Sequence, residues 1–368
     1  MRLLVSFSIM AGMLLNIPAH ENASKNAVAI EALSRLKGID LEANPAVKKA
    51  VVKTLDSVRG TPEYVQLIKD FNLKEQEAGL LETALLNATN SVGVDAIRLL
   101  AAQANNELLG TALKGSNGAA LALIMGNAAE KQFVPLLVES VQSAGQPNQT
   151  RVAATKALSQ TEPGARALLD LAKGTNIPAD LKTIALHELQ TVRWEEIKKE
   201  AIQLSPQTAQ VSEAEFPPIA ELVKRKGNPG NGAAVFRKQE VGCINCHQVN
   251  GEGIDFGPKL SEIGTKLGKD ALYDSIINPS AGVAFGYEAW QLELKNGDEA
   301  FGLITSETAE EVTLKTQNGI ATAYKKRDIA KRDKMSTSIM PGGLHLVMPE
   351  QDLVDLVEYL ASLKKPGS

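Results

Sequence analysis

Both cysteines of this 368-residue chain lie within residues 241–253, VGCINCHQVNGEG, where a histidine directly follows the second one. Cysteines at this spacing are typical of a redox dithiol, half of a zinc site or a covalent cofactor attachment. A structural zinc site needs four Cys or His ligands, and the sequence offers no other cysteine and only four histidines. A thioredoxin-like dithiol follows a strand, whereas residues 228–236, NPGNGAAVF, predict a turn and a short helix. The pattern therefore favours cofactor attachment.

The C-x-x-C-H order is that of c-type haem attachment. The thiols of Cys243 and Cys246 would bond to the haem vinyl groups, and His247 would be the proximal iron ligand. A ligating histidine needs its other ring nitrogen held by a hydrogen bond. The stretch GPKL shortly afterwards supplies an acceptor, because the Pro258 carbonyl can take this bond while Leu260 packs on the haem face. The sequence thus predicts one covalently bound haem c.

The sixth iron ligand is expected from the loop before the last predicted helix. Met348 directly precedes that helix, and Met335 ends the charged run KKRDIAKRDK. Met340, in SIMPGGL, is followed by a proline and two glycines, a loop that can lay the thioether over the porphyrin. We therefore expect Met340, with His345, Met335, Met348 or an open site as alternatives. A Met/His iron suits single-electron transfer, whereas an open site admits peroxide.

Two predicted helices complete a small cytochrome fold. The first is residues 230–238, GNGAAVFRK, in which Gly232 permits a close helix crossing. The second is residues 349–364, PEQDLVDLVEYLASLK, which begins with proline and carries Leu and Val on one face. We expect Phe236 of the first helix to contact Leu356 and Tyr359 of the second.

Residues 228–366 resemble the haem-binding cytochrome c domain that closes many large secreted bacterial proteins. There it follows HEAT-like repeats and often a quinoprotein-like sugar dehydrogenase propeller. The matching stretches are GAAVFRKQEVGCINCHQVNGEG, GPKLSEIGTKLGKDALYDSIINPSAGVAFGYEAW, SIMPGGL and DLVDLVEYL. The resemblance implies Cys243 and Cys246 as haem attachments, His247 as proximal ligand and Met340 as distal ligand. No propeller precedes the repeats, so the dehydrogenase activity does not carry over.

The first half of the chain repeats a theme of Ala/Leu/Val-rich helices separated by Pro/Gly breaks, at a spacing of roughly thirty residues. First helices end near residues 55, 86, 158 and 189, and second helices start near residues 62, 94, 132, 163 and 194. Helix pairs at this period predict a HEAT-like α-solenoid that holds a partner or a neighbouring domain. An irregular helical bundle is the alternative. His187 lies among apolar residues and is interpreted as a structural helix residue.

An insert separates the two cytochrome-like stretches. Residues 287–328 alternate like strands, with turn dipeptides at Asn296–Gly297 and Asn318–Gly319, and predict two β-hairpins beside the haem domain. The adjoining run KKRDIAKRDK, residues 325–334, is basic in an acidic chain. We interpret it as a solvated surface loop, and its alternative role is to steer an acidic redox partner.

Charge and the N-terminus bear on partners and location. A formal net charge of −4 and a pI near 5.8 argue against nucleic-acid binding. Residues 1–23 carry Arg2 and then an apolar run, the order of a secretory signal, with an uncleaved anchor as the alternative. No later apolar run reaches the ~20 residues that span a bilayer. We therefore expect export to the periplasm, and membrane contact only through an uncleaved anchor.

The sequence as a whole predicts a mainly α chain: a HEAT-like solenoid over 24–204, a linker over 205–227, and a cytochrome c domain over 228–368 that carries the β insert. The predicted function is that of a periplasmic mono-haem c-type cytochrome. It would transfer single electrons from a partner dehydrogenase docked by the repeats, rather than act as an enzyme itself. The alternatives are a peroxidase-like enzyme with an open haem site and a repeat scaffold with a redox tag.

Overall fold

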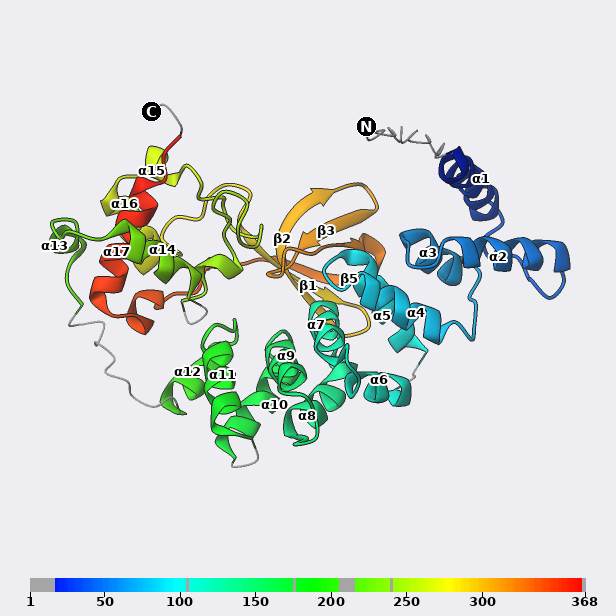
Figure 1. Cartoon of the computed structure of the whole chain (residues 1–368), viewed down its shortest axis with the longest axis horizontal. Coiled ribbons are helices and arrows are strands. Elements are labelled where there is room, and N and C mark those ends of the chain that lie inside the picture. The colour runs from blue at the N-terminus through cyan, green and yellow to red at the C-terminus, as the bar shows by residue number, and fades with distance from the viewer. Residues whose placement is uncertain (1–16, 104–105, 175–176, 205–215, 239–240, 366–368) are drawn as a thin grey trace, which may run out of the picture. The chain divides into compact units, whose positions relative to one another are not determined.

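The computed structural model describes residues 17–103, 106–174, 177–204, 216–238 and 241–365. It divides into two compact units, residues 1–83 and 84–368, drawn in Figure 1. Most of the predicted leader lies outside the described residues, and only 17–23 are described, as the start of the first helix. Within the described ranges, no helix combines the length and apolar character needed to cross a membrane.

The first unit is helical. Its helices are α1 (Ile17–Ser34), α2 (Pro45–Ser57), α3 (Pro62–Asp70) and most of α4 (Glu77–Leu86). Both α2 and α3 begin with proline, whose missing N–H costs nothing in the first turn.

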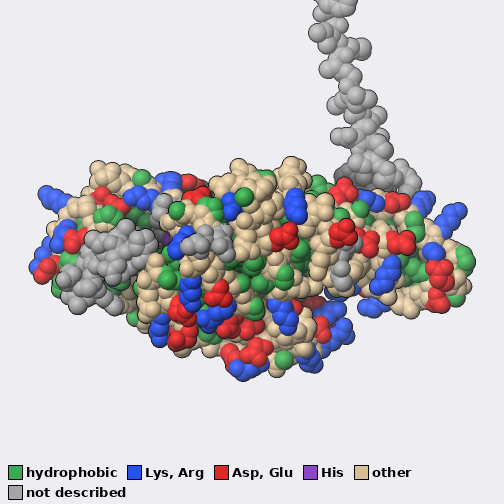
Figure 2. All heavy atoms as spheres, turned by 90° about the horizontal axis from the view of Figure 1, so that it is seen from below, with side chains coloured by type: hydrophobic (Ala, Val, Ile, Leu, Met, Phe, Trp, Pro, Cys, Tyr) green, Lys and Arg blue, Asp and Glu red, His purple; other side chains and the backbone are tan. Residues whose placement is uncertain are grey.

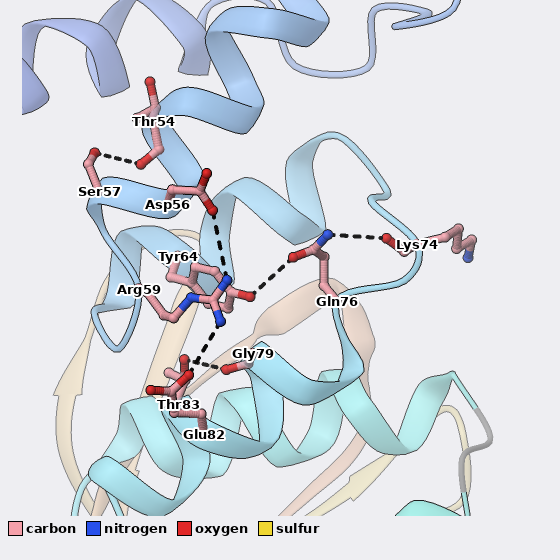
Figure 3. A network of polar contacts seen from close by, with 10 residues as sticks. All are labelled: Thr54, Asp56, Ser57, Arg59, Tyr64, Lys74, Gln76, Gly79, Glu82 and Thr83. Atoms are coloured by element: carbon pink, nitrogen blue, oxygen red, sulfur yellow. Dashed lines mark hydrogen bonds and ion pairs between the residues drawn. The ribbon is translucent and has the colours of Figure 1, made fainter.

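Tyr64 is the central side chain of the first unit and is fully buried (Figure 3). Its hydroxyl donates to Gln76 Oε1 at 3.2 Å, and Arg59 lies over its ring at 5.8 Å. The Arg59 guanidinium also reaches Glu82 Oε2 at 3.4 Å. A Cβ atom at Gly79 would stand 1.8 Å from the Tyr64 oxygen, so α4 packs this closely only because residue 79 is glycine.

The second unit starts with a run of helices. They are α5 (Ser91–Ala102), α6 (Asn106–Leu113), α7 (Gly118–Ala128), α8 (Val134–Gln142), α9 (Asn148–Leu158), α10 (Glu162–Lys173), α11 (Ala179–Gln190) and α12 (Glu195–Leu204). The predicted mainly α fold is confirmed. His187 lies half-buried in α11. The HEAT-like character of the repeats and the domain boundaries stay predictions.

Helices α6 and α7 were not predicted. In α7 most side chains are buried, because α5 and α9 pack against it from different sides. A Cβ at Gly126 would lie 2.8 Å from Ala157 Cα, which shows how closely α9 approaches. A helix that is apolar on nearly every side has no amphipathic stripe, so its sequence lacks the periodicity from which a helix is predicted.

The insert is one five-stranded antiparallel sheet rather than two separate hairpins. Its strands are β1 (Ala289–Leu294), β2 (Glu299–Glu307), β3 (Glu311–Lys315), β4 (Ala321–Lys325) and β5 (Ile329–Lys334), in the order β4-β3-β2-β1-β5. The two predicted turns are present. Gly297 (φ 83°) and Gly319 (φ 76°) both occupy the left-handed region, which closes a three-residue hairpin loop.

Most of the basic run is a strand and not the surface loop that the sequence suggested, while Lys325 ends β4 and residues 326–328 form a 3-10 turn. Residues 329–334 form β5, which pairs with β1 in antiparallel register. The Arg332 guanidinium lies over the Trp290 ring at 4.4 Å, so its charge does not prevent packing against the sheet. Because β5 is an edge strand, its charged residues also protect the sheet from pairing with other chains.

The sheet is fixed to the helices of the second unit by two arginines. Arg98 donates to Tyr324 Oη in β4 at 2.8 Å and lies over that ring at 5.1 Å. Arg193 bonds Glu299 Oε2 at 2.6 Å and lies 4.9 Å from the Phe301 ring, and burial lowers the pKa of its guanidinium. These contacts hold the insert against the helices α5–α12 of the same unit (Figure 1).

The C-terminal helices form a separate apolar core within the same unit. They are α13 (Ile219–Leu222), α14 (Pro229–Arg237), α15 (Ile263–Lys266), α16 (Lys269–Ile277) and α17 (Glu350–Ser362). Leu222, within the predicted linker, is fully buried in this core, and its carbonyl accepts from Tyr273 Oη at 3.4 Å. The described end of the predicted linker is thus packed against the domain that follows.

Helices α14 and α17 cross as expected. A Cβ at Gly232 would lie 1.9 Å from the Asp355 carbonyl oxygen, so only glycine permits this approach. Phe236 and Tyr359 pack with their ring centroids 6.0 Å apart. The buried Asp355 carboxylate accepts from the Asn228 N–H at 2.8 Å, which ties the start of α14 to the middle of α17.

We predict that Gly79→Ala lowers the free energy of unfolding of the first unit by about 1 to 3 kcal/mol, because the added methyl group overlaps the buried Tyr64 hydroxyl. Gly110→Ala is the control. A Cβ at Gly110, inside α6, meets nothing closer than 3.6 Å, so this change is expected to be neutral or mildly stabilising. Denaturant unfolding followed by hydrogen exchange measures both, with the α3 and α4 amides reporting Gly79→Ala and the α6 amides reporting Gly110→Ala. Equal stability of the two variants would contradict the packing argument.

Candidate functional site

The cysteine–histidine motif begins where α14 ends. Gly242 (φ 73°) turns the chain into a single 3-10 turn, Cys243–Asn245. The Cys243 carbonyl accepts from the His247 N–H at 2.9 Å, which holds the second cysteine and the histidine one turn beyond the first. This compact turn sets the two thiols and the imidazole on one short segment.

The His247 ring is held by the segment that follows. Its Nδ1 lies 2.7 Å from the Pro258 carbonyl oxygen, which leaves Nε2 as the nitrogen that can bind a metal. A Cβ at Gly257 would stand 2.6 Å from the imidazole Cε1, so glycine leaves the room that the ring occupies. Burial lowers the pKa of His247, although the bond to Pro258 opposes this, and the neutral, ligating imidazole is favoured at neutral pH.

The two thiols are uncharged at neutral pH and are not bonded to each other. Burial raises the pKa of Cys243 to about 12 and that of Cys246 to about 11. Redox-active dithiols instead lower the pKa of one cysteine, because the thiolate is the reactive form. The environment therefore disfavours a catalytic dithiol and suits thioether attachment.

The structure gathers Cys243, Leu260 and Met340 around one apolar core, where all three are half-buried. The Leu260 N–H donates to the Gln248 carbonyl at 2.9 Å, which keeps the GPKL segment beside the motif. The Met340 N–H donates to Ser338 Oγ at 3.1 Å. These contacts place the predicted distal-ligand loop at the same core as the attachment motif.

The alternative distal ligands have other contacts. Met348 is buried in the core at the start of α17, and its exposed fraction is 7%. The buried His345 ring packs edge-on against Phe216, with centroids 4.8 Å apart. Met335 continues the sheet pairing, since its N–H donates to the Ala289 carbonyl. Met340, by contrast, is half-buried at the core that includes Cys243 and lies outside the sheet.

Comparison with known families gives the decisive match. A cytochrome c family model matches residues 230–298, from α14 through the first strand of the insert. This segment is a cytochrome c domain. The match ends before Met340, as expected where an inserted sheet interrupts the family pattern. No curated protein matches the chain.

The cytochrome c domain fits the haem that its family implies. The donor set is two neutral thiols and one oriented imidazole, and the surroundings are apolar. Because residue 257 is glycine, no side chain occupies the space beside the His247 ring. These are the features that a haem-binding redox protein of this family requires.

Two functional positions were not predicted from the sequence. One is Gly257, for which the only signal was its place before Pro258. The other is the β3–β4 turn, where Gln317 Nε2 approaches Cys246 Sγ at 4.0 Å and Lys315 pairs with Asp255 at 2.9 Å. The insert therefore contacts the attachment motif itself.

We predict that Gly257→Ala disturbs the haem site, because the methyl group displaces the His247 ring from its bond to Pro258. Loss of such an orienting contact typically weakens ligation about tenfold or more. The yield of covalently bound haem, measured by absorbance of its alkaline pyridine complex, should fall several-fold. Gly282→Ala is the control, since nothing lies within 4 Å of that position. A normal yield from Gly257→Ala would show that the ring tolerates the methyl group.

We also predict a pH dependence that arises from Asp355. Burial opposes its charge, but hydrogen bonds from Asn228, Gln351 and Asn231 outweigh this and leave its pKa below the usual value. Ionised Asp355 therefore stabilises the domain fully above about pH 4, and this contribution is lost as pH falls through the lower folded-state pKa.

Asp355→Asn should be less stable at neutral pH and should lose less stability between about pH 4 and pH 2 than the unchanged protein. Guanidinium unfolding followed by haem absorbance reports this domain alone. Glu262→Gln removes an exposed carboxylate of the same domain and should keep the original slope. Parallel acid curves for Asp355→Asn and the unchanged protein would exclude this role.

Proposed function

We propose that the chain is a periplasmic mono-haem c-type cytochrome that transfers single electrons between partner proteins. The observation that carries the proposal is the His247–Pro258 hydrogen bond, found within a cytochrome c domain beside two uncharged thiols. Haem bound there would supply one-electron redox chemistry. One electron arrives from a reduced partner and one leaves to an oxidised acceptor in each cycle, with no bond made or broken in the chain.

Each residue of the proposed site has a separate task. Cys243 and Cys246 form the thioether attachments, and His247 is the proximal ligand. Pro258 fixes the imidazole orientation, which also makes that nitrogen a better ligand. Leu260 packs on the haem face. Met340 would serve as the distal ligand, and its soft thioether would favour the ferrous state and close the iron to small ligands.

Location and partner belong to the same proposal. Cytochrome c domains are commonly exported, and the predicted signal at residues 1–23 agrees with the periplasm. The electron donor is proposed to be a dehydrogenase that docks on the helical repeats. The support for docking is that stacked helix pairs bury one stripe against their neighbours and leave an extended surface for a partner.

Replacement of the distal ligand tests the proposal. The full-length protein should have a low-spin ferric spectrum with a methionine–iron charge-transfer band, and Met340→Ala should abolish that band. Met335→Ala removes a methionine of the same segment and should leave the band unchanged. If the band survives in Met340→Ala, another residue is the ligand. If the unchanged protein is high-spin and turns over peroxide, the electron-transfer function is wrong.

A further inference from the structure

The β3–β4 turn, residues 317–319, lies against the haem attachment motif. Gln317 Nε2 points to Cys246 Sγ at 4.0 Å, the outer limit for a hydrogen bond to sulfur. Beside it, Lys315 Nζ bonds Asp255 Oδ2 at 2.9 Å. A Cβ at Gly319 would come within 3.2 Å of Ile254 Cγ2. Three consecutive parts of the hairpin therefore contact the loop that carries the second cysteine and follows it.

The same turn is anchored on the helical repeats. Asn318 Nδ2 donates to Asn127 Oδ1, and Asn127 is buried near the end of α7. The adjoining strand β4 is held at the same place, because Arg98 donates both to Tyr324 Oη at 2.8 Å and to the Ala128 carbonyl at 2.9 Å. Within this three-residue loop, Gln317 contacts the attachment motif and Asn318, the next residue, bonds to α7.

We propose that this turn covers the haem edge at Cys246, and that Asn127 holds it there, so that Gln317 and Asn127 are positioning residues that raise the reduction potential. The inference rests on the proposed haem site. Reduction of ferric haem removes a positive charge, so it is favoured where water is excluded and a donor N–H faces the haem edge. The turn would supply the cover and Gln317 the donor, since its amide nitrogen lies 4.0 Å from the Cys246 sulfur.

Potentiometric titration of the full-length haem protein tests the inference. Gln317→Ala should shift the ferric/ferrous equilibrium towards the ferric form by up to about tenfold, or about 59 mV. Gln317→Glu, which places a negative charge beside the sulfur, should lower the potential at least as far. Gln317 is exposed, so neither variant is expected to disturb folding. An unchanged potential in both variants overturns the proposal.

The role of Asn127 has its own control. Asn127→Ala should lower the potential in the same direction, and the double variant with Gln317→Ala should equal the larger single effect, because both act through one turn. Lys131→Ala breaks a contact of the repeats with the other hairpin, where Lys131 Nζ meets the Asn296 carbonyl at 3.2 Å. It should leave the potential unchanged. An equal shift in Lys131→Ala would mean that general loosening, and not the β3–β4 turn, is responsible.

The test separates this inference from the function on which it rests. If the unchanged protein lacks the absorption bands of covalently bound haem, the proposed function fails. If it has normal bands and a potential that none of the Gln317 and Asn127 variants alters, the haem site stands and the inference is wrong. Haem content and thermal unfolding, measured for every variant, identify any change that is due to lost structure.

Discussion

The crossing of α14 and α17 is the contact on which the site depends. Helix α14 ends at Arg237, shortly before the attachment motif begins at Cys243, and α17 begins at Glu350, after the loop that carries Met340. The motif and Met340 are about ninety residues apart along the chain, yet the approach of Gly232 to the Asp355 carbonyl brings the ends of the two helices to one core. A larger residue at 232 would separate the helices, and with them the two proposed halves of the iron site. The buried carboxylate of Asp355 fixes the crossing in place, because it accepts backbone and side-chain hydrogen bonds from the start of α14.

The inserted sheet explains how so small a domain is linked to a long helical segment. Its hydrophobic side chains form their own small core, and its outer contacts are aromatic and charged: Arg98 with Tyr324, and Arg193 with Phe301 and Glu299. A guanidinium is planar and more weakly hydrated than an ammonium, and it can stack on a ring while bonding an oxygen, so it can fix an interface without a large apolar surface. The sheet consequently reaches the helices on one side and the attachment loop on the other.

Sequence reasoning succeeded where the signal was local. The C-x-x-C-H spacing, the GPKL segment and the glycine of α14 each lie within a few residues of what they explain, and the mainly helical character of the first half follows from apolar periodicity. Sequence reasoning failed where the structure depends on which elements pack against one another. Helix α7 packs against α5 and α9 and is mostly buried, so its sequence has no polar face. Strand β5 is an edge strand, and its many charged residues are typical of a loop in sequence-based prediction. The contact of Gln317 with Cys246 depends on how the sheet meets α7, which no local pattern records.

The charges of the basic run, residues 325–334, change how a partner could recognise this domain. Lys326 and Arg332 both bond the carboxylate of Glu307, at 2.7 and 2.9 Å, and these bonds lower its pKa to about 2, so it remains ionised through the physiological range. Lys331 pairs in the same way with Asp333. On the face drawn in Figure 2, basic and acidic side chains are likewise interspersed. Paired charges project little field beyond the Debye length of about 8 Å at physiological salt, so a basic run in the sequence is not a basic patch on the molecule. Pairing therefore reduces the field with which this run could steer an acidic partner, and that role stays a prediction.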